Sequence, residues 1–495
     1  MKNNADKPNL IFIMADQLRC DALGRGFTPN IDAIFSEGIK FDRAYCSCPL
    51  CAPSRASVFT GMYPATNGSL INPWMPDDEK YGLVKENIPT MYQTMAKDWE
   101  VIHSGKQHVF TEGGKLEDKE NAVCWMANEK SYAEFVRKSG KRMPGGPKFR
   151  TLVPEMIGGK YTRAAVYSTP ATGCYPENEA YYSDSYFAEK ALEGMRNRKG
   201  DRPLFLSMMF FAPHPPFEIP EPWYSFIKKQ DVVLPENVGM YYPRQSPLQM
   251  YNLTGVIGSR YSREEWTESW RVYWGLTAML DFLVGKIISE LKREGAYDNS
   301  LIIFCSDHGE MLGSHALFQK MCMYEESVHV PLAIRLPGGV HGGTHIPEAV
   351  SLIDVLPTIY DYLKIPVPEQ VDGVSLRQRI ENRSGTASSR DIFIQYDGNG
   401  TLSNFQRCVI SDRYKLIVDL FKDEVFYELY DLKSDPQEQN NLLFTENIGS
   451  YDTAAGYLFA KLKNHMRDVS DWLRIPDFEP EVFRKNYQNL KVKLQ

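Results

Sequence analysis

Three continuous apolar runs along the chain are typical of strands buried on both faces. They span residues 9–14, 204–211 and 301–305, and each ends shortly before a group of polar residues. Continuous apolar character, as opposed to strict alternation, favours parallel strands that helices cover on both sides. Between the second and third runs, a predicted helix has one apolar face, with residues at positions 276, 280, 284, 287 and 291. This succession predicts an open α/β fold.

The pattern changes after about residue 365. The proline-containing stretch 365–368 and the polar stretch 381–390 are typical of connecting segments. We therefore predict a large α/β domain at residues 1–375 and a smaller C-terminal α+β domain at residues 376–495. Within the smaller domain, four runs rich in β-branched and aromatic residues predict an antiparallel sheet, at 391–396, 407–410, 414–418 and 425–430.

Polar residues that could bind a ligand follow directly on the three predicted strands. Asp16 follows the first run, His214 the second, and the pair Asp307-His308 the third. Because ligands in open α/β sheets bind beyond the carboxyl ends of the strands, we expect these side chains at one edge. Acids after strands often cap helices instead. The adjoining Asp-His pair nevertheless favours a divalent cation site, and an imidazole ligand favours Ca²⁺, Mn²⁺ or Zn²⁺ over Mg²⁺.

A second group of candidates could bind an anion. A tetrahedral dianion such as sulfate or phosphate requires several fixed donors and positive charges. Lys106 and His108 are two residues apart, so an extended segment would place both on one face. No single basic residue is informative alone, and the hypothesis rests on the combination of Arg55, Lys106, His108, His214 and Lys320.

Length, charge and cysteine content narrow the class of protein. At 495 residues the chain exceeds one ordinary domain, and its net charge of −7 argues against a nucleic-acid binder. The apolar stretch 10–15 is stopped by Asp16, too early for a signal-peptide core or a membrane span. Nine cysteines form no framework typical of a small secreted domain. We therefore expect a cytoplasmic protein that binds neither nucleic acid nor membrane.

Three of the nine cysteines lie close together, at Cys46, Cys48 and Cys51. Zinc ligands have similar spacing, but no second Cys or His pair completes a zinc site. We predict that Cys46 and Cys48 are buried small apolar residues.

Cys51 differs because of the sequence that follows it. Residues 51–61, Cys-Ala-Pro-Ser-Arg-Ala-Ser-Val-Phe-Thr-Gly, resemble the signature of the type I sulfatases, members of the alkaline phosphatase superfamily. In that signature the cysteine of Cys-x-Pro-x-Arg is oxidised to formylglycine. The resemblance covers almost the whole chain, through segments at 9–16, 105–108, 212–217, 306–310, 320–331 and 430–442. It implies an alkaline-phosphatase-like fold, with a large, mixed but mostly parallel sheet flanked by helices.

The resemblance also implies a cation site and a maturation partner. Asp16, Cys51, Asp307 and His308 would hold one divalent cation, Ca²⁺ in preference to Mn²⁺ or Zn²⁺, with Gln17 as a further candidate ligand. A formylglycine-generating enzyme would convert Cys51 to 3-oxoalanine, which is formylglycine.

Roles in covalent catalysis are implied for the remaining site residues. Arg55 would orient the hydrated aldehyde, one hydroxyl of which attacks sulfur. Lys106 and Lys320 would bind sulfate, and His214 with Lys320 would protonate the departing alcohol. His108 would accept the proton whose loss expels sulfate.

Two positions depart from the common family pattern. Gln17 stands where many relatives carry a second acid, and His308 where many carry Asn. The same arrangement occurs in choline sulfatases and in the related phosphonate monoester hydrolases. The first hypothesis is hydrolysis of a sulfate monoester of a carbohydrate or small alcohol, and the second is phosphonate monoester or phosphodiester hydrolysis. The pair Lys106 and His108 favours the first, because phosphonate hydrolases tend to lack it.

A third hypothesis is a non-catalytic anion- or glycan-binding protein, which the complete set of catalytic residues argues against. Residues 137–163 contain eight basic residues and one acid, Glu155, and could recruit a polyanionic glycan. A solvated loop rich in Gly and Pro is the favoured interpretation of this segment. The sequence does not predict an oligomeric state.

Overall fold

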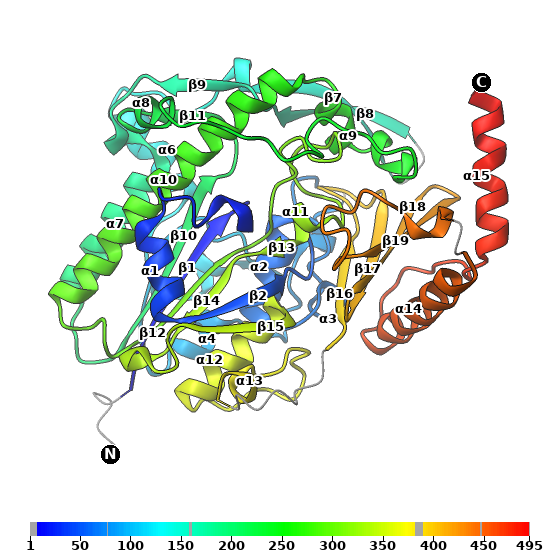
Figure 1. The fold of residues 1–495 in the computed structure, drawn as a ribbon. Coiled ribbons are helices and arrows are strands. Elements are labelled where there is room, and N and C mark those ends of the chain that lie inside the picture. Colours follow the sequence, from blue (N-terminus) through cyan, green and yellow to red (C-terminus); the bar gives the residue numbers. More distant parts are fainter. Residues whose placement is uncertain (1–6, 77, 158–160, 382–389, 446–447, 495) are drawn as a thin grey trace.

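The computed structural model describes residues 7–76, 78–157, 161–381, 390–445 and 448–494. Within these residues, the main sheet has nine strands in the order β13-β2-β14-β12-β1-β10-β3-β6, and β15 pairs with β2 (Figure 1). Five neighbouring strands are parallel: β12 (Ser300–Ser306), β1 (Asn9–Asp16), β10 (Leu204–Pro213), β3 (Glu100–Gly105) and β6 (Val123–Ala127). The others are β2 (Ile39–Tyr45), β13 (His329–Val330), β14 (Leu332–Arg335) and β15 (Thr344–Ser351). The predicted mixed, mostly parallel sheet is confirmed.

The three apolar runs form the adjacent central strands β12, β1 and β10, as predicted. Every residue of β1 is buried, since its two faces lie under helices. Met14 pairs with Met209 of β10 and with Cys305 of β12, so the three strands end at the same edge of the sheet. That edge receives the polar residues that follow each strand.

Helices cover both faces of the main sheet (Figure 1). One layer contains α1 (Pro29–Glu37), α7 (Ser183–Asn197) and α10 (Arg263–Arg293), and the other contains α2 (Cys51–Thr60), α4 (Met91–Met95) and α12 (Val355–Leu363). The predicted apolar face of α10 is buried against the sheet. By length and composition alone α10 could cross a membrane, but 78% of its most apolar window is buried inside the protein.

Short elements complete the described part of the main body. The two-stranded pairs are β4 (Phe110–Thr111) with β5 (Gly114–Lys115), β7 (Arg150–Ile157) with β8 (Tyr161–Ser168), and β9 (Thr172–Tyr175) with β11 (Phe217–Pro220). The shorter helices are α3 (Pro64–Asn67), α5 (Leu116–Lys119), α6 (Glu129–Lys138), α8 (Trp223–Ile227), α9 (Leu253–Gly258), α11 (Glu325–Val328) and α13 (Arg377–Glu381).

The C-terminal region forms the predicted antiparallel sheet. Its order is β16-β17-β18-β19, with β16 (Ile392–Tyr396), β17 (Phe405–Ser411), β18 (Tyr414–Phe421) and β19 (Glu424–Asp431). A second hydrophobic core lies between this sheet and the helices α14 (Ile448–Asp468) and α15 (Pro480–Leu494). The domain boundary at residues 375/376 stays a prediction. Of the predicted connecting stretch 381–390, residues 382–389 lie outside the described residues.

Buried polar contacts join the C-terminal sheet to the main body. Lys415 of β18 is fully buried, and its Nζ lies 2.8 Å from Oε1 of both Glu325 and Glu438. Gln406 of β17 donates from Nε2 to the carbonyl oxygen of Met321, at 3.1 Å. Because Met321 follows Lys320, the C-terminal sheet supports a segment that carries a predicted site residue.

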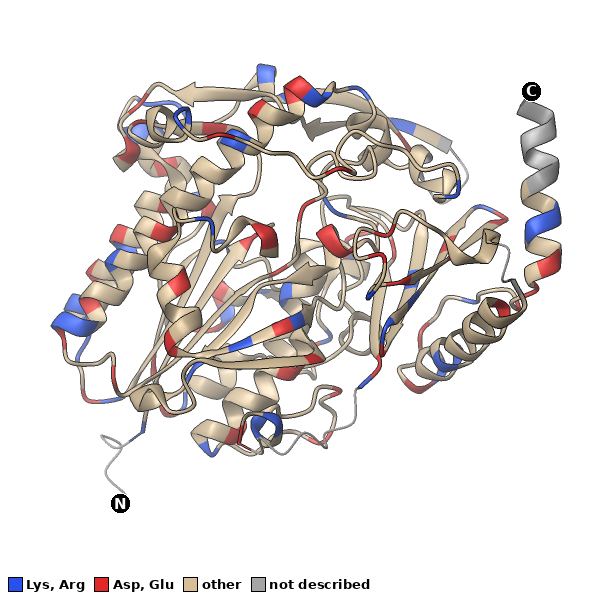
Figure 2. Cartoon of the chain, viewed as in Figure 1, with Lys and Arg blue, Asp and Glu red and all other residues tan. Residues whose placement is uncertain are grey.

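The favoured interpretation of residues 137–163 as a solvated loop is wrong for most of the segment. It contains the end of α6 and the antiparallel pair β7 and β8, whose side chains alternate between buried Val153 and exposed Leu152. The Gly and Pro residues that suggested a loop concentrate at 144–147, before β7 begins. Over the chain as a whole, Lys and Arg are interspersed with Asp and Glu along the helices and strands, as Figure 2 shows. Lys160 lies outside the described residues.

Candidate active site

The carboxyl edge of the parallel strands brings the predicted site residues together. Asp16 ends β1, Lys106 follows β3, His214 follows β10, and Asp307 follows β12. Cys51 is the first residue of α2, a helix whose residues are all buried. The sheet register therefore explains why residues from distant parts of the sequence meet in one place.

Four of these residues form a compact donor group. One ligand atom from each of Asp16, Cys51, Asp307 and His308 lies within 4.8 Å of the others. His308 Nε2 is 3.1 Å from Cys51 Sγ and 3.6 Å from Asp307 Oδ1. Nδ1 of the same ring lies 3.0 Å from the carbonyl oxygen of Gly309, so a proton on Nδ1 leaves the Nε2 lone pair facing the group. Two carboxylates and an imidazole fit one divalent cation.

Two cations bind the other side of the same carboxylates. Arg55 Nε donates to Asp307 Oδ2 at 2.8 Å, and its Nη2 donates to Asp16 Oδ2 at 3.2 Å. Lys106 Nζ also donates to Asp16 Oδ2. Burial alone would raise the pKa of Asp16, but the cations Lys106 and Arg55 hold it well below its usual value. Asp16 is therefore ionised at neutral pH, and its Oδ1 faces the donor group.

The Cys51 side chain shares this electrostatic environment. Burial and Asp16 favour the neutral thiol, whereas Lys106, Lys320 and His308 favour the thiolate and lower its pKa to about 7. The Sγ atom marks the place where an oxygen atom would stand after oxidation of the residue. The positive charges around it suit any anionic group bound at this position.

Gln17 has a left-handed backbone conformation, with φ of 68°. Its Oε1 accepts from Lys320 Nζ at 2.7 Å, and its Nε2 donates to Glu310. Burial raises the pKa of Glu310 to about 7. The structure therefore engages the Gln17 amide with Lys320 and Glu310, and a role as cation ligand stays a prediction.

Lys320 and His214 form a second contact that matters chemically. Lys320 Nζ lies 3.3 Å from His214 Nε2, and His214 Nδ1 lies 2.5 Å from the carbonyl oxygen of Pro215. Burial and the charge of Lys320 hold the pKa of His214 well below its usual value. The imidazole is neutral, donates from Nδ1 and accepts at Nε2 from the ammonium group. Such a pair can pass a proton to a bound group.

His108 reaches the site in a way that the sequence did not predict. Its φ of 48° breaks the expected extended segment, yet both Lys106 and His108 line the same cavity. Glu129, at the start of α6, lies 2.9 Å from His108 Nε2. Burial lowers the pKa of His108, and Lys106 lowers it further against the opposing effect of Glu129. Glu129 was missed, because the sequence around it marks only a helix start at Asn128.

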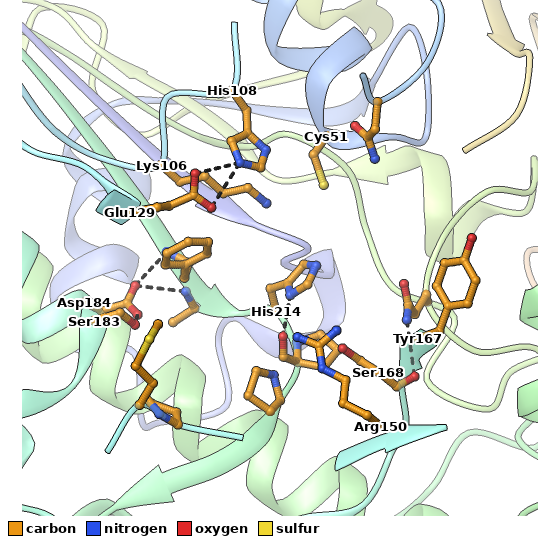
Figure 3. Close-up of a pocket in the computed structure, with 18 of the residues that line it drawn as sticks. Cys51, Lys106, His108, Glu129, Arg150, Tyr167, Ser168, Ser183, Asp184 and His214 are labelled. Atoms are coloured by element: carbon orange, nitrogen blue, oxygen red, sulfur yellow. Dashed lines mark hydrogen bonds and ion pairs between the residues drawn. The ribbon is translucent and has the colours of Figure 1, made fainter. Parts of the chain in front are cut away.

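The cavity that these residues line has a volume of about 470 Å³ (Figure 3). Its floor contains Cys51, Lys106, His108, His214 and Lys320, and its outer wall contains Trp74, Arg150, Val166 and Tyr167. Asn72 also lines the cavity, accepts from the amide of Ala52 at 3.1 Å, and donates to Asn399 at 2.9 Å. No motif in the sequence pointed to either asparagine.

Comparisons with known protein families match nearly the whole chain. The family model described as "Sulfatase" matches residues 8–365. A second model, described as "N-sulphoglucosamine sulphohydrolase, C-terminal", matches residues 313–469. The two matches together include every predicted site residue.

Individual proteins show the same similarity at modest identity. An arylsulfatase of Clostridium perfringens is 27% identical over 459 residues, covering 89% of this chain and 91% of that protein. An N-acetylglucosamine-6-O-sulfatase of Bacteroides thetaiotaomicron is 26% identical over 476 residues, covering 89% of this chain and 83% of that protein. The crystal structure of a phosphonate monoester hydrolase of Agrobacterium radiobacter shares the fold, with a TM-score of 0.75 at 22% identity. That alignment covers 93% of this chain and 96% of the hydrolase.

Proposed function

The chain belongs to the sulfatase family and is a sulfuric ester hydrolase, and we propose that it cleaves sulfate monoesters with a nucleophile made from Cys51. In this proposal Cys51 is oxidised to formylglycine by a separate maturation enzyme. The observation that carries the proposal is the position of Cys51, between the Asp16, Asp307 and His308 donor group and a cationic cavity floor. Both a cation and an anionic substrate can reach the same side chain there.

The donor group suits one divalent cation, for which we propose Ca²⁺, with Mn²⁺ or Zn²⁺ as alternatives. Asp16 and Asp307 each direct Oδ2 toward Arg55, so the ion would lie at Asp16 Oδ1, His308 Nε2 and Asp307 Oδ1. Asp307 Oδ1 also accepts from the backbone amides of Gln17 and His308, at 3.1 and 2.9 Å. When bound, such an ion supplies Lewis-acid stabilisation of negative charge on the substrate oxygens.

The cationic residues of the floor bind and orient the sulfate group. We assign sulfate binding to Lys106 and Lys320, whose ammonium groups both line the cavity. Arg55 fixes Asp16 and Asp307 and also donates to the carbonyl oxygen of Lys106, at 2.7 Å. It therefore holds the acids and the sulfate-binding lysine in one arrangement.

Two histidines move protons in this proposal. His214 delivers a proton from Lys320 to the oxygen of the departing alcohol. His108 accepts a proton at Nδ1, a buried atom without a hydrogen-bond partner among the described residues. Glu129 binds the opposite nitrogen, so the Nδ1 lone pair is available. Each such transfer contributes roughly 10²–10⁴-fold to the rate.

A phosphonate monoester or phosphodiester is the second candidate substrate. The pairs Asp16-Gln17 and Asp307-His308 are compatible with it, because they match the arrangement noted for both choline sulfatases and phosphonate monoester hydrolases. Lys106 and His108, which both line the cavity, favour the sulfate ester.

The test combines mass spectrometry with kinetics on protein made in its own host. We expect the proteolytic peptide that contains residue 51 to carry an aldehyde in place of the cysteine thiol. We also expect kcat/KM for an aryl sulfate to exceed kcat/KM for the matching aryl phosphonate. Cys51→Ala should lower kcat by at least about 10⁴-fold, as loss of a nucleophile does in other enzymes. Cys48→Ala, which alters a neighbouring buried thiol, is the control and should retain activity. Hydrolysis of the aryl sulfate by protein whose Cys51 is a plain thiol would refute the proposed nucleophile.

A further inference from the structure

Most basic residues near the outer wall already have partners. Lys138, Lys141, Arg142 and Arg163 form ion pairs with Glu134, Glu177, Glu218 and Glu155. Lys148 donates to the carbonyl oxygen of Thr172. Arg150 lines the cavity, and its side chain has no acidic or hydrogen-bonding partner among the described residues. Its guanidinium group is therefore free to bind a ligand.

The other charged groups of the cavity are engaged within the protein. Lys106 binds Asp16, and Lys320 binds Gln17. The two acids of the wall are also engaged: Glu129 directs both oxygens toward His108, and Asp184 accepts from the backbone amides of Phe211 and Ala212. Among the described lining residues, Arg150 is the charged group that lacks a counterpart.

Arg150 and His214 line the same cavity. Figure 3 shows the Arg150 side chain extending from β7 toward His214, the residue assigned to protonate the departing alcohol. The base of this side chain is fixed, because Phe149 before it is buried and Arg150 pairs with Ser168 in the β7 and β8 ladder. The backbone of Arg150 is thus held in the outer wall of the cavity.

An aromatic surface lies in the same cavity. Trp74 is 49% exposed and packs edge-on against His108 and Phe110, with ring centroids 5.3 and 5.6 Å apart. An exposed indole that is fixed by two neighbours offers an apolar face to a sugar ring. A planar guanidinium group binds carboxylate or sulfate through two parallel hydrogen bonds.

We propose that Arg150 binds a second acidic group on the alcohol part of the substrate. The substrate class is therefore a sulfated sugar that carries a carboxylate or a second sulfate, in preference to a neutral or cationic alcohol such as choline. The inference rests on the proposed function for the identity of the cleaved ester. The acid subsite itself depends only on Arg150, Trp74 and the shape of the outer wall.

Paired substrates test the proposal kinetically. A panel of sulfated monosaccharides is assayed as pairs that differ only in a second sulfate or a carboxylate, with choline sulfate as the cationic comparison. The pair with the highest kcat/KM is used, and selectivity is defined as kcat/KM for its acidic member divided by kcat/KM for its partner without the second acid. Arg150→Gln should lower this ratio by about 10- to 100-fold. Arg150→Lys should recover part of this ratio, since it keeps the charge and loses the paired hydrogen bonds.

Arg137→Gln is the matched control. It removes the same charge from the same basic segment, but Arg137 is exposed at the end of α6 and does not line the cavity. Its ratio should equal that of the wild type. An unchanged ratio in Arg150→Gln, or an equal loss in Arg137→Gln, would overturn the subsite.

Calorimetry separates this inference from the proposed function. In a Cys51→Ala background, which cannot turn over, the acidic sugar should bind about 10- to 100-fold more weakly when Arg150→Gln is added. If the mature enzyme hydrolyses no sulfate ester, the proposed function fails while this binding comparison still decides the role of Arg150. Equal affinity in the two proteins would refute the subsite whatever the enzyme hydrolyses.

Discussion

The floor and the outer wall of the cavity are built on different principles. Counted together with Arg55 and the donor-group acids Asp16 and Asp307, the floor takes its residues from the ends of β1, β3, β10 and β12 and from α2, and both acids are buried and contact a cation. The outer wall takes its residues from β7, β8 and Trp74, with Leu152 of the same hairpin 64% exposed and Val166 59% exposed. The parallel sheet fixes the geometry of the floor, whereas a two-stranded ribbon presents the wall residues.

This contrast indicates that the floor residues carry out the chemistry and that the wall residues select the substrate. A buried group of charges is stable only when every member is present, so few substitutions at a floor residue are tolerated. Exposed residues of the wall contribute little to folding and can change with the substrate. Floor and wall should therefore respond differently to the same kind of substitution.

Arg55→Met should have the largest effect on stability. The change leaves the Oδ2 atoms of Asp16 and Asp307 without the guanidinium group, and we expect the free energy of unfolding to fall by about 3–5 kcal/mol. Arg163→Met breaks the pair with Glu155, whose other oxygen still accepts from Tyr167, so the loss should be smaller, about 1–2 kcal/mol. Urea denaturation measures both. Equal losses for the two variants would contradict the distinction between floor and wall.

Removal of the cation should have the next largest effect. Chelation should lower the free energy of unfolding by about 2.7 kcal/mol relative to protein at a cation concentration 100 times the dissociation constant. The melting temperature, followed while Ca²⁺, Mn²⁺ or Zn²⁺ is added back, measures the effect and ranks the ions. The floor variant Asp307→Asn should lose the response and the wall variant Leu152→Ser should keep it. A melting temperature indifferent to chelator and ions would count against a cation in the donor group.

The free energy of unfolding should depend on pH through His103 of β3. Burial lowers the pKa of this ring to about 3, from a usual value of 6.5. Below pH 6.5 the unfolded chain takes up a proton that the folded state refuses, so the contribution of His103 to stability falls as pH falls. The advantage of wild type over His103→Gln should shrink by about 1.2 kcal/mol between pH 6 and pH 5. Tyr92→Phe, which alters only a hydroxyl bonded to His103, should keep the wild-type slope.

Leu152→Ser should have the smallest effect. The side chain lies on the exposed face of β7, opposite Val166, so we expect a change below about 0.5 kcal/mol in the free energy of unfolding. Thermal denaturation checks this value. A loss comparable to that of Arg55→Met would mean that the wall is part of the folded core.

The sequence predicted the floor well because the floor depends on strand ends. Asp16 and Asp307 each follow a continuous apolar run, and parallel strands deliver such residues to one edge. The C-terminal strands were equally readable from their β-branched and aromatic residues. Lys320 follows no predicted strand, and it was named only as one member of the cationic combination and through the family resemblance. Its place in the floor depends on contacts with Gln17 and His214 that no local pattern reveals.

The outer wall was predicted poorly because tertiary packing creates it. Residues 137–163 were interpreted mainly as a loop, and nothing in the sequence singled out Arg150 among eight basic residues. Arg150 stands out because, among the residues that the structure describes, its basic neighbours have partners and it has none. Glu129 was missed for a similar reason, since its contact with His108 joins two segments 21 residues apart. Lys106 and His108 line the same cavity, but the φ of 48° at His108 shows that the expected extended backbone was wrong.

The buried ion group around Lys415 limits how relatives of this protein can be recombined. Lys415 and Glu438 lie in the C-terminal region, whereas Glu325 lies in the main body. A chimera joined near residue 375 would take Glu325 from one parent and Lys415 from the other. If the parents differ at either position, the hybrid buries a charge without its partner, which typically costs about 3–5 kcal/mol. The two regions are thus constrained to be inherited together, and a graft must carry α11 along with the C-terminal sheet.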